Sequence, residues 1–413
     1  MRRGWLRATL AFAVLMAGVI VGWWVATLPS ASLVWSVSLG GRPRVLGLAL
    51  NPRTSNVFVL DHDRSTVSML DGNGRLMSTT SVSDYPISFA VDQATARVIV
   101  ATEDYGYETV TLLNGRTGAA IRTTVVSAGT LGNPVVVAGE TPGALSYVTD
   151  ANGIAVLDPR RGMIERTIPA DAPPFVAAVD IPRSLIYLRQ GDRMIHVLDT
   201  RTGQLIARFM LPEETDLLAG TLAGSYGYAV VSRGDTVALD RMDLRRGTIV
   251  SSSMLSGYPI AAVMDRRTQR IFFALNRGIV SVLNSRTTYF TQDVQVGHMP
   301  SALAVDVVRG HVFVANTGDD TLSVLDARNG LVRRTVRVGP GPQAIVVDEV
   351  TGRVFVAIKG GQERMVEPDS WQWVPNWVPR GLRRWLPFLP PPGSRVHIIT
   401  VPPGVAILDE ARL

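Results

Sequence analysis

The chain has 413 residues, of which 46% are hydrophobic and none is Cys, so it has no disulfide framework, no Cys-ligated metal and no thiol nucleophile. Its formal net charge of +6 comes from two segments: residues 1–35 carry three Arg and no acid, and residues 359–404 carry six basic and three acidic side chains. The rest of the chain is neutral and lacks the broad basic surface of a nucleic-acid-binding protein, so no nucleic-acid partner is expected.

The first predicted element is a transmembrane helix over residues 8–28, a run of 21 residues without a charge. As a helix this run is about 31 Å long, which matches the hydrocarbon core of a bilayer. Arg2, Arg3 and Arg7 precede it within residues 1–7, and the next charge is Arg42. The positive-inside rule therefore predicts a cytoplasmic basic flank and an extracytoplasmic main body.

Two alternatives compete with an uncleaved signal-anchor. A cleaved signal peptide usually has a shorter apolar region and a small-x-small site, and the best such site here, Ser30 and Ser32 around Ala31, is poor. The start Arg2-Arg3 also resembles a twin-arginine export signal. We expect the helix to remain in the mature chain and to hold it in the cell membrane as a single-pass protein.

From residue 33 onward the chain repeats itself with a period of about 42 residues. A Pro precedes seven of eight units: Pro43, Pro86, Pro134, Pro174, Pro259, Pro300 and Pro342. In six units an Asp or Asn closes one apolar run six residues before the next run begins: Asn51, Asp92, Asp180, Asp265, Asp306 and Asp348. These residues favour tight turns between strands, so the pattern predicts hairpins and no catalytic role for its acids.

A second turn follows later in each unit. In four units an acid or amide ends an apolar run with Gly four residues on: Asn114, Asp158, Asp199 and Asp326. In the other four units Asp71, Asp240, Asn284 and Asp409 mark this turn without the fixed Gly. Each unit is therefore predicted to hold four antiparallel strands, a to d, as in 302–306, 312–316, 322–326 and 332–338.

Strand b of two units reads Tyr147-Val148-Thr149-Asp150 and Phe313-Val314-Ala315-Asn316. In these residues the chain resembles the YVTN family of β-propeller repeats, over roughly residues 33–358 and 405–413. The resemblance implies an all-β propeller of four-stranded blades that is exported or displayed on the cell surface. Many members of that family have seven blades, which is the alternative to the eight units counted here.

The two chain ends complement each other. Residues 33–39 look like a strand d without its own a, b and c, whereas 344–348, 354–358 and 405–409 look like a, b and c without a strand d. We expect the N-terminal strand to complete the last blade and close the ring, which leaves no long sheet edge open. Residues 33–413 are thus predicted to form one β-propeller domain.

The last unit contains an insertion, residues 359–404, rich in Trp, Pro and Arg, where other units have a short loop. The candidate binding residues are its aromatic and basic side chains: Trp371, Trp373, Trp377, Arg380, Arg383, Arg384, Trp385 and Phe388. Residues 378–386 have the spacing of a short amphipathic basic helix. It could contact the membrane interface, bind a protein partner or anionic lipid, or cap the propeller.

Function is predicted less directly. His62, His298 and His397 are weak candidates for a metal or acid–base site, since they belong to loops at one end of the ring, whereas His196 and His311 are expected to be structural. No cofactor motif is present. We expect a binding or scaffolding module; the alternative is an exported propeller enzyme, of the lactone hydrolase or quinone-dependent oxidoreductase type, with its site on the b–c and d–a loops.

Overall fold

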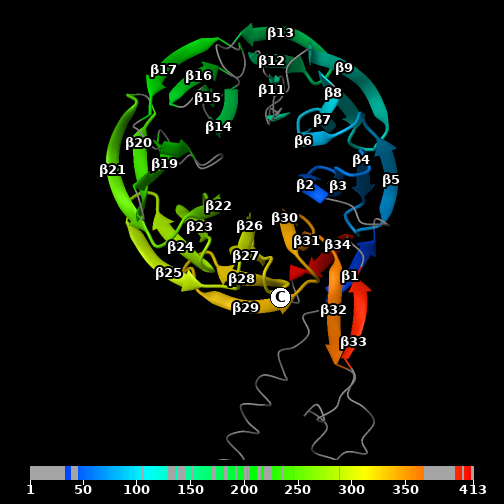
Figure 1. Ribbon diagram of the computed structural model, residues 1–413, viewed down its shortest axis with the longest axis vertical. Coiled ribbons are helices and arrows are strands. Elements are labelled where there is room, and N and C mark those ends of the chain that lie inside the picture. Colours follow the sequence, from blue (N-terminus) through cyan, green and yellow to red (C-terminus); the bar gives the residue numbers. More distant parts are fainter. Residues whose placement is uncertain are drawn as a thin grey trace, which may run out of the picture.

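The computed structural model describes residues 33–38, 45–104, 106–128, 136–137, 145–150, 153–169, 174–180, 185–190, 193–199, 202, 204–211, 215–217, 226–233, 236–244, 246–287, 289–366, 396–401 and 404–410. In this part of the chain the regular elements are β-strands, which form eight four-stranded antiparallel sheets and one two-stranded sheet. Figure 1 shows the eight sheets arranged as the blades of a ring. None of the described residues forms a helix long and apolar enough to cross a membrane. The predicted transmembrane helix, residues 8–28, lies outside the described residues.

We number the blades in chain order and call their strands a to d from the inside of the ring outward (Figure 1). Blade 1 is β2 (Val45–Asn51), β3 (Asn56–Asp61), β4 (Thr66–Leu70) and β5 (Leu76–Ser81). Blade 2 is β6 (Pro86–Asp92), β7 (Arg97–Asp104), β8 (Tyr107–Asn114) and β9 (Ala120–Ala128). Blade 3 is β10 (Val136–Val137), β11 (Ser146–Asp150), β12 (Gly153–Asp158) and β13 (Met163–Pro169). Blade 4 is β14 (Pro174–Asp180), β15 (Leu185–Gln190), β16 (Met194–Asp199) and β17 (Leu205–Met210).

The second half of the chain continues in the same order. Blade 5 is β18 (Thr215–Leu217), β19 (Tyr226–Arg233), β20 (Thr236–Asp243) and β21 (Thr248–Leu255). Blade 6 is β22 (Pro259–Asp265), β23 (Arg270–Leu275), β24 (Ile279–Asn284) and β25 (Phe290–Gln295). Blade 7 is β26 (Pro300–Asp306), β27 (His311–Asn316), β28 (Thr321–Asp326) and β29 (Val332–Arg337). Blade 8 combines both chain ends: β30 (Pro342–Asp348), β31 (Arg353–Ile358), β34 (Gly404–Asp409) and β1 (Leu33–Ser38).

The repeated Asp at the end of strand a builds the a–b turn, as the sequence predicts. Asp265 and Asp348 are fully buried, yet each accepts a backbone N–H from the residue two positions on, at 2.9 and 3.0 Å, and a Thr hydroxyl at 2.7 Å. The fifth residue of the turn has a positive φ, and in blades 7 and 8 it is Gly310 and Gly352. The side chain and the left-handed residue together reverse the chain.

Blade 5 corrects one detail of the sequence pattern. Asp240 was expected to end strand c without a following Gly, but it lies inside β20, which runs on to Asp243. Gly247 follows Asp243 by four residues, has φ +65° and donates its N–H to the Asp243 carbonyl at 2.8 Å. This blade therefore keeps the Gly turn, and the longer strand displaced it by three residues.

Apolar side chains fill the space between neighbouring blades. Between blades 8 and 1, for example, Phe355 and Ile407 pack with Val57, Val59 and Leu70, and all five are fully buried. Burial of each such side chain stabilises the fold by about 1.5–3 kcal/mol. Because every blade packs on two neighbours, the core is a sequence of such layers around the ring.

The N-terminal strand occupies the outer position of blade 8. β1 pairs antiparallel with β34, from Leu33 opposite Leu408 to Ser38 opposite Gly404. The predicted neighbour of residues 33–39 is therefore the observed one. Blade 8 also carries an element that the sequence did not predict, the two-stranded sheet of β32 (Gly361–Val366) and β33 (Val396–Val401), which lies between its strands b and c in the chain.

Candidate functional site

The ring has two ends, because alternate strand directions put the b–c and d–a connections at one end and the a–b and c–d turns at the other. We call the first the ribbon end, since the β32–β33 ribbon begins there, and the second the turn end. The sequence-predicted insertion, His62 and His298 all belong to the ribbon end. The buried charges of blades 7 and 8 belong to the turn end.

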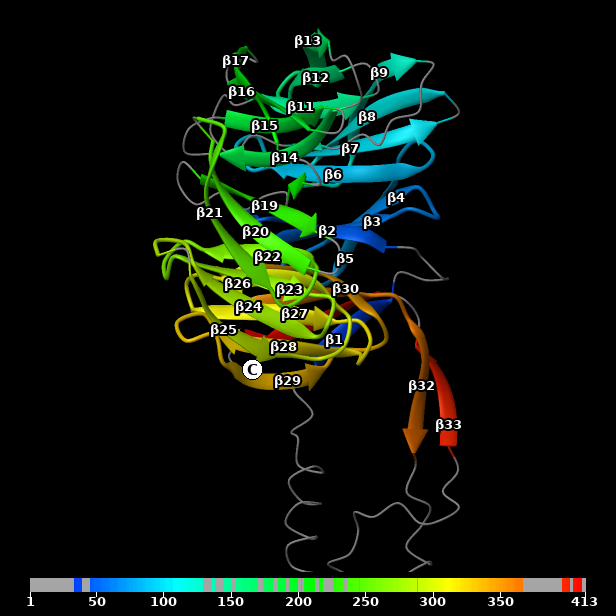
Figure 2. The same cartoon turned by 60° about the vertical axis from the view of Figure 1, so that its left-hand side comes forward.

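The ribbon extends strand b of blade 8 beyond the ring. Its six residue pairs run from Gly361 opposite Val401 to Val366 opposite Val396, a length of about 20 Å. At its base the Lys359 N–H donates to the Gly341 carbonyl at 3.0 Å, which ties the ribbon to the loop before β30. Figures 1 and 2 both show β32 and β33 pointing away from the blades. The insertion thus begins as an ordered arm.

The candidate binding residues of the insertion follow β32 and precede β33 in the chain. Trp371, Trp373, Trp377, Arg380, Arg383, Arg384, Trp385 and Phe388, with the predicted amphipathic helix over 378–386, all lie outside the described residues. Their role stays a prediction. What the structure adds is their point of departure, Val366, and their point of return, Val396.

The three candidate His residues are not drawn together by any contact between described residues. His62 Nδ1 lies 3.1 Å from its neighbour Asp63, and His298 Nδ1 lies 2.8 Å from Asp319. His397 is in β33, opposite Met365. Among the described residues no group of three or more His, Cys, Asp or Glu side chains is arranged to hold a metal ion.

Asp319 holds His298 in a fixed orientation. Its second oxygen accepts the His298 backbone N–H at 2.7 Å, and this bond, with the imidazole contact, holds the pKa of Asp319 below its usual range. The imidazole itself is mostly exposed. His298 is therefore a positioned surface side chain with an acidic partner.

The ribbon end also carries large exposed side chains at one repeated position, which we call the corner: the residue directly before the Pro that begins strand a. The corner residues are Tyr85, Tyr258, Met299 and Gly341. Each corner carbonyl accepts an N–H from the end of strand b or from the residue after it, at 2.9–3.1 Å, so the four corners have the same backbone role. Their side chains are not required for that bond.

Two corners hold a bulky side chain in a backbone conformation that favours Gly. Tyr85 and Met299 both have φ +49°, and Gly341, in the same place, has φ +62°. A Cβ at such a φ costs about 1–2 kcal/mol. Tyr85 is 48% exposed and Met299 65% exposed, so little burial offsets this cost. Sequence reasoning missed both residues, because neither the exposure nor the positive φ is visible in the sequence.

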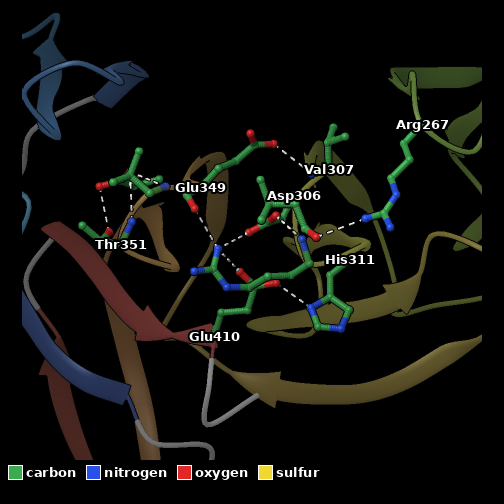
Figure 3. A network of polar contacts seen from close by, with 11 residues as sticks. Arg267, Asp306, Val307, His311, Glu349, Thr351 and Glu410 are labelled. Atoms are coloured by element: carbon green, nitrogen blue, oxygen red, sulfur yellow. Dashed lines mark hydrogen bonds and ion pairs between the residues drawn. The ribbon is translucent and has the colours of Figure 1, made fainter.

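At the turn end a buried ionic network joins blades 7 and 8 (Figure 3). Asp306, fully buried, accepts the Arg309 guanidinium at 2.9 Å. The same Arg309 nitrogen donates to the Glu349 carbonyl of blade 8 at 2.9 Å and lies 3.8 Å from Glu410 Oε2. Glu410, whose side chain is 1% exposed, meets His311 Nδ1 at 2.5 Å through Oε1. His311 thus contributes to the contact between the two blades, which is the structural kind of role expected for it.

The two acids of this network are perturbed in opposite directions. Burial, reinforced by the neighbouring Asp306, raises the pKa of Glu410 although His311 opposes the shift. Burial also acts to raise the pKa of Asp306, but hydrogen bonds from the Glu410 carboxyl and from Arg309 lower it below its usual range. A proton is therefore retained on Glu410 in preference to Asp306.

Comparison with known proteins gives the fold alone. No protein-family model matches the chain, and no curated protein matches it. Among solved structures, BamB from Moraxella catarrhalis is 17% identical with a TM-score of 0.57, and the match covers 79% of this chain and 96% of BamB. Sqt1 from Saccharomyces cerevisiae is 11% identical with a TM-score of 0.62, covering 79% and 95%. The computationally designed Ika8 protein is 16% identical with a TM-score of 0.58, covering 78% and 96%. BamB and Sqt1 have β-propeller folds, so the architecture of this chain is that of a β-propeller.

Proposed function

We propose that this protein is a membrane-anchored, extracytoplasmic β-propeller that binds a protein partner at its ribbon end and acts as a scaffold without catalysis. The observation that carries the proposal is the pair of exposed corner side chains, Tyr85 and Met299, held at a φ that Gly favours. Residues held in such a conformation cluster at functional sites and ligand clamps. Exposed aromatic and Met side chains are typical of protein interfaces.

The ribbon is a second observation in favour of a binding surface at the ribbon end. It leaves from Lys359, beside the Gly341 corner, and its two strands flank in the chain the segment that contains the four Trp of the insertion. An isolated two-stranded sheet is marginally stable in water, so a ribbon of this length favours a surface against which it packs. We infer that the insertion and the corners contribute to one attachment surface.

The membrane location rests on the N-terminal sequence and on the position of β1. Four residues, 29–32, separate the predicted helix from Leu33, a reach of about 13 Å. Blade 8 is thus expected to lie close to the bilayer, and its pairing with β1 to close the ring. The repeat tetrapeptides support a relationship with YVTN-type propellers. An exported hydrolase or oxidoreductase stays the alternative, and no contact among the described residues favours it.

The corner residues provide the sharpest test. Replacing Tyr85→Gly and Met299→Gly together removes two exposed side chains and relieves two strained φ angles. We expect the free energy of unfolding to stay equal or to rise by up to about 2 kcal/mol, while partner binding weakens. Met77→Ala, at an equally exposed position on the outer strand β5, is the matched control and should leave binding unchanged.

Binding is measured by photo-crosslinking in intact cells, with the reactive side chain placed at 85, 299 or 77. We expect protein adducts at 85 and 299 and none at 77. A double variant that melts several degrees lower would show that the corner side chains stabilise the ring, and the proposal would then be wrong.

The insertion is tested separately by replacing Trp377, Arg383, Arg384 and Trp385 with Ala or Ser. If the insertion binds the protein partner, the adducts at 85 and 299 decrease and the melting temperature is unchanged. If it binds lipid instead, those adducts persist and binding to anionic vesicles is lost. A variant that keeps both activities but melts much lower would identify the segment as a structural cap.

A further inference from the structure

Glu410 occupies a position that blades 2, 6 and 7 fill with a small residue. The residue after strand c donates its backbone N–H to the fifth residue of the a–b turn in four blades, at 2.8–2.9 Å. In blades 2, 6 and 7 this residue is Gly115, Ser285 and Ala327. In blade 8 it is Glu410, whose N–H donates to Gly352 in the same way. The turn does not require a carboxyl group here.

The Glu410 carboxyl is aimed at the contact with blade 7. In three blades the first residue of strand b reaches the c–d turn of the following blade. Asn56 donates to the Gly115 carbonyl at 3.1 Å, and Arg353 donates to Asn73 at 2.6 Å. His311 of blade 7 uses the same route to reach Glu410 at 2.5 Å. Blade 8 therefore offers a titratable carboxyl, Glu410, where blade 2 offers the backbone carbonyl of Gly115.

The surroundings of this carboxyl are crowded with charge. The groups that contact it are Asp306, Arg309 and His311, all from blade 7. On blade 8 the Glu349 carboxylate accepts the Val307 N–H instead, and the Arg353 guanidinium donates to Asn73 of blade 1. Glu410 Oε2 is buried without a hydrogen-bond partner. When Glu410 is ionised, two carboxylates share the Arg309 guanidinium inside this junction. When it carries a proton, it can bridge Asp306 and His311.

We propose that Glu410 is a proton-controlled latch that holds blade 8 against blade 7, tight when its carboxyl is protonated and loosened when it ionises. Blade 8 carries both β1, which follows the predicted anchor, and the ribbon. This contact places a buried carboxyl between an Arg and a His of the neighbouring blade. The latch would set how firmly the blade that bears both attachments is held.

The direction of the pH dependence follows from the pKa shifts of Glu410 and Asp306. The pKa of Glu410 is raised, so its stabilising contribution is fully present below the ordinary carboxyl pKa and declines as pH rises through the raised value. The pKa of Asp306 is lowered, so its contribution is present above its ordinary value and is lost as pH falls through the lowered one. The junction is therefore most stable between the lowered pKa of Asp306 and the raised pKa of Glu410, and it tightens as pH falls through the raised pKa of Glu410.

The test compares the full chain with Glu410→Gln, whose amide cannot ionise. Unfolding by urea and local hydrogen exchange are followed between about pH 5 and pH 8. For the wild type we expect the folding equilibrium constant to fall as pH rises, tenfold for each unit by which the pKa is raised. In Glu410→Gln this part of the pH dependence of the folding equilibrium constant should be absent. The variant should then be more stable than the wild type at the upper pH. Glu165→Gln, at an exposed position on β13, should keep the wild-type slope.

Hydrogen exchange shows which part of the structure responds to pH. Corrected for intrinsic rates, protection of the Glu410 and Val307 amides, both hydrogen-bonded at this junction, should rise on acidification in the wild type and not in Glu410→Gln. Protection of the Ser285 amide, its counterpart in blade 6, should not change. Should Glu410→Gln fail to fold, the second variant is Glu410→Ala, because Ala327 occupies the equivalent position in blade 7. The same pH dependence of protection at Glu410 and Ser285 in the wild type, or an unchanged pH dependence of the folding equilibrium in the variants, would overturn the latch.

Discussion

At the scale of single residues, three buried acids differ in how many of their carboxyl oxygens accept a hydrogen bond. Asp265, Asp348 and Glu410 are all buried at the turn end. Both oxygens of the two Asp accept turn donors, whereas one oxygen of Glu410 has none. A buried carboxyl oxygen without a donor is costly to keep ionised, which makes its protonation state responsive to pH.

The fifth residue of the a–b turn gives a matched pair of substitutions. Gly310 and Gly352 have φ +74° and +72°, but a Cβ at 310 meets nothing within 4 Å, whereas one at 352 would lie 2.7 Å from the Arg309 guanidinium. We expect Gly310→Ala to lower the free energy of unfolding by about 1–2 kcal/mol, from the strained φ alone. Gly352→Ala should cost clearly more, because Arg309 must also move. Urea unfolding measures both, and equal losses would show that Arg309 does not pack on this turn.

At the scale of strands and turns, the sequence was informative wherever a local turn signal marked a strand end. The Asp or Asn that ends strand a and the Gly after strand c predicted most hairpins. The pattern failed in blade 5, where two Asp residues lie three apart and Asp243, rather than Asp240, ends β20. Local chemistry gives the turn type but cannot choose between two candidates in one long strand.

The ribbon and the Glu410 network were missed for a different reason. Gly361 pairs with Val401 across the whole insertion, and no turn residues mark that pairing in the sequence. Glu410 follows the last strand near the chain end and reads as a solvated acid, and only the packing of blade 8 on blade 7 buries it. Contacts distant in sequence decide both features, and a repeat pattern does not contain them.

Strand β1 provides a prediction at the same scale. It forms five paired positions with β34, so its loss leaves the outer edge of blade 8 without a partner. At roughly 0.5–1.5 kcal/mol for each ladder hydrogen bond, a chain lacking residues 1–40 should be less stable by on the order of 3 kcal/mol. A chain lacking only residues 1–30 is the control. Urea unfolding compares the two, and a synthetic peptide of residues 31–40 should restore part of the loss; equal stability would mean that β1 does not hold the ring.

At the scale of the whole molecule, β1, which follows the proposed anchor, and the ribbon belong to one blade but leave it at opposite ends. Leu33 lies opposite Leu408, so β1 begins at the turn end, whereas the ribbon begins at the ribbon end. With about 13 Å between the predicted helix and Leu33, the turn end of blade 8 is the part of the ring that the anchor brings nearest the bilayer. The proposed anchor would therefore turn the ribbon end away from the lipid, toward the proposed protein partner.

Since the chain contains no Cys, single Cys residues can report this orientation directly. Val350, 72% exposed in the a–b turn of blade 8, and Met299, 65% exposed at a corner, mark the two ends. With a fluorophore on each Cys variant and a quencher carried by lipid, we expect stronger quenching at 350 than at 299. Leu205, exposed on the outer strand β17 of blade 4, should show the least if the ring stands on its edge, because blade 4 lies across the ring from blade 8 (Figure 1). Stronger quenching at 299 than at 350 would place the ribbon end on the membrane, and the insertion would then be a lipid-binding arm.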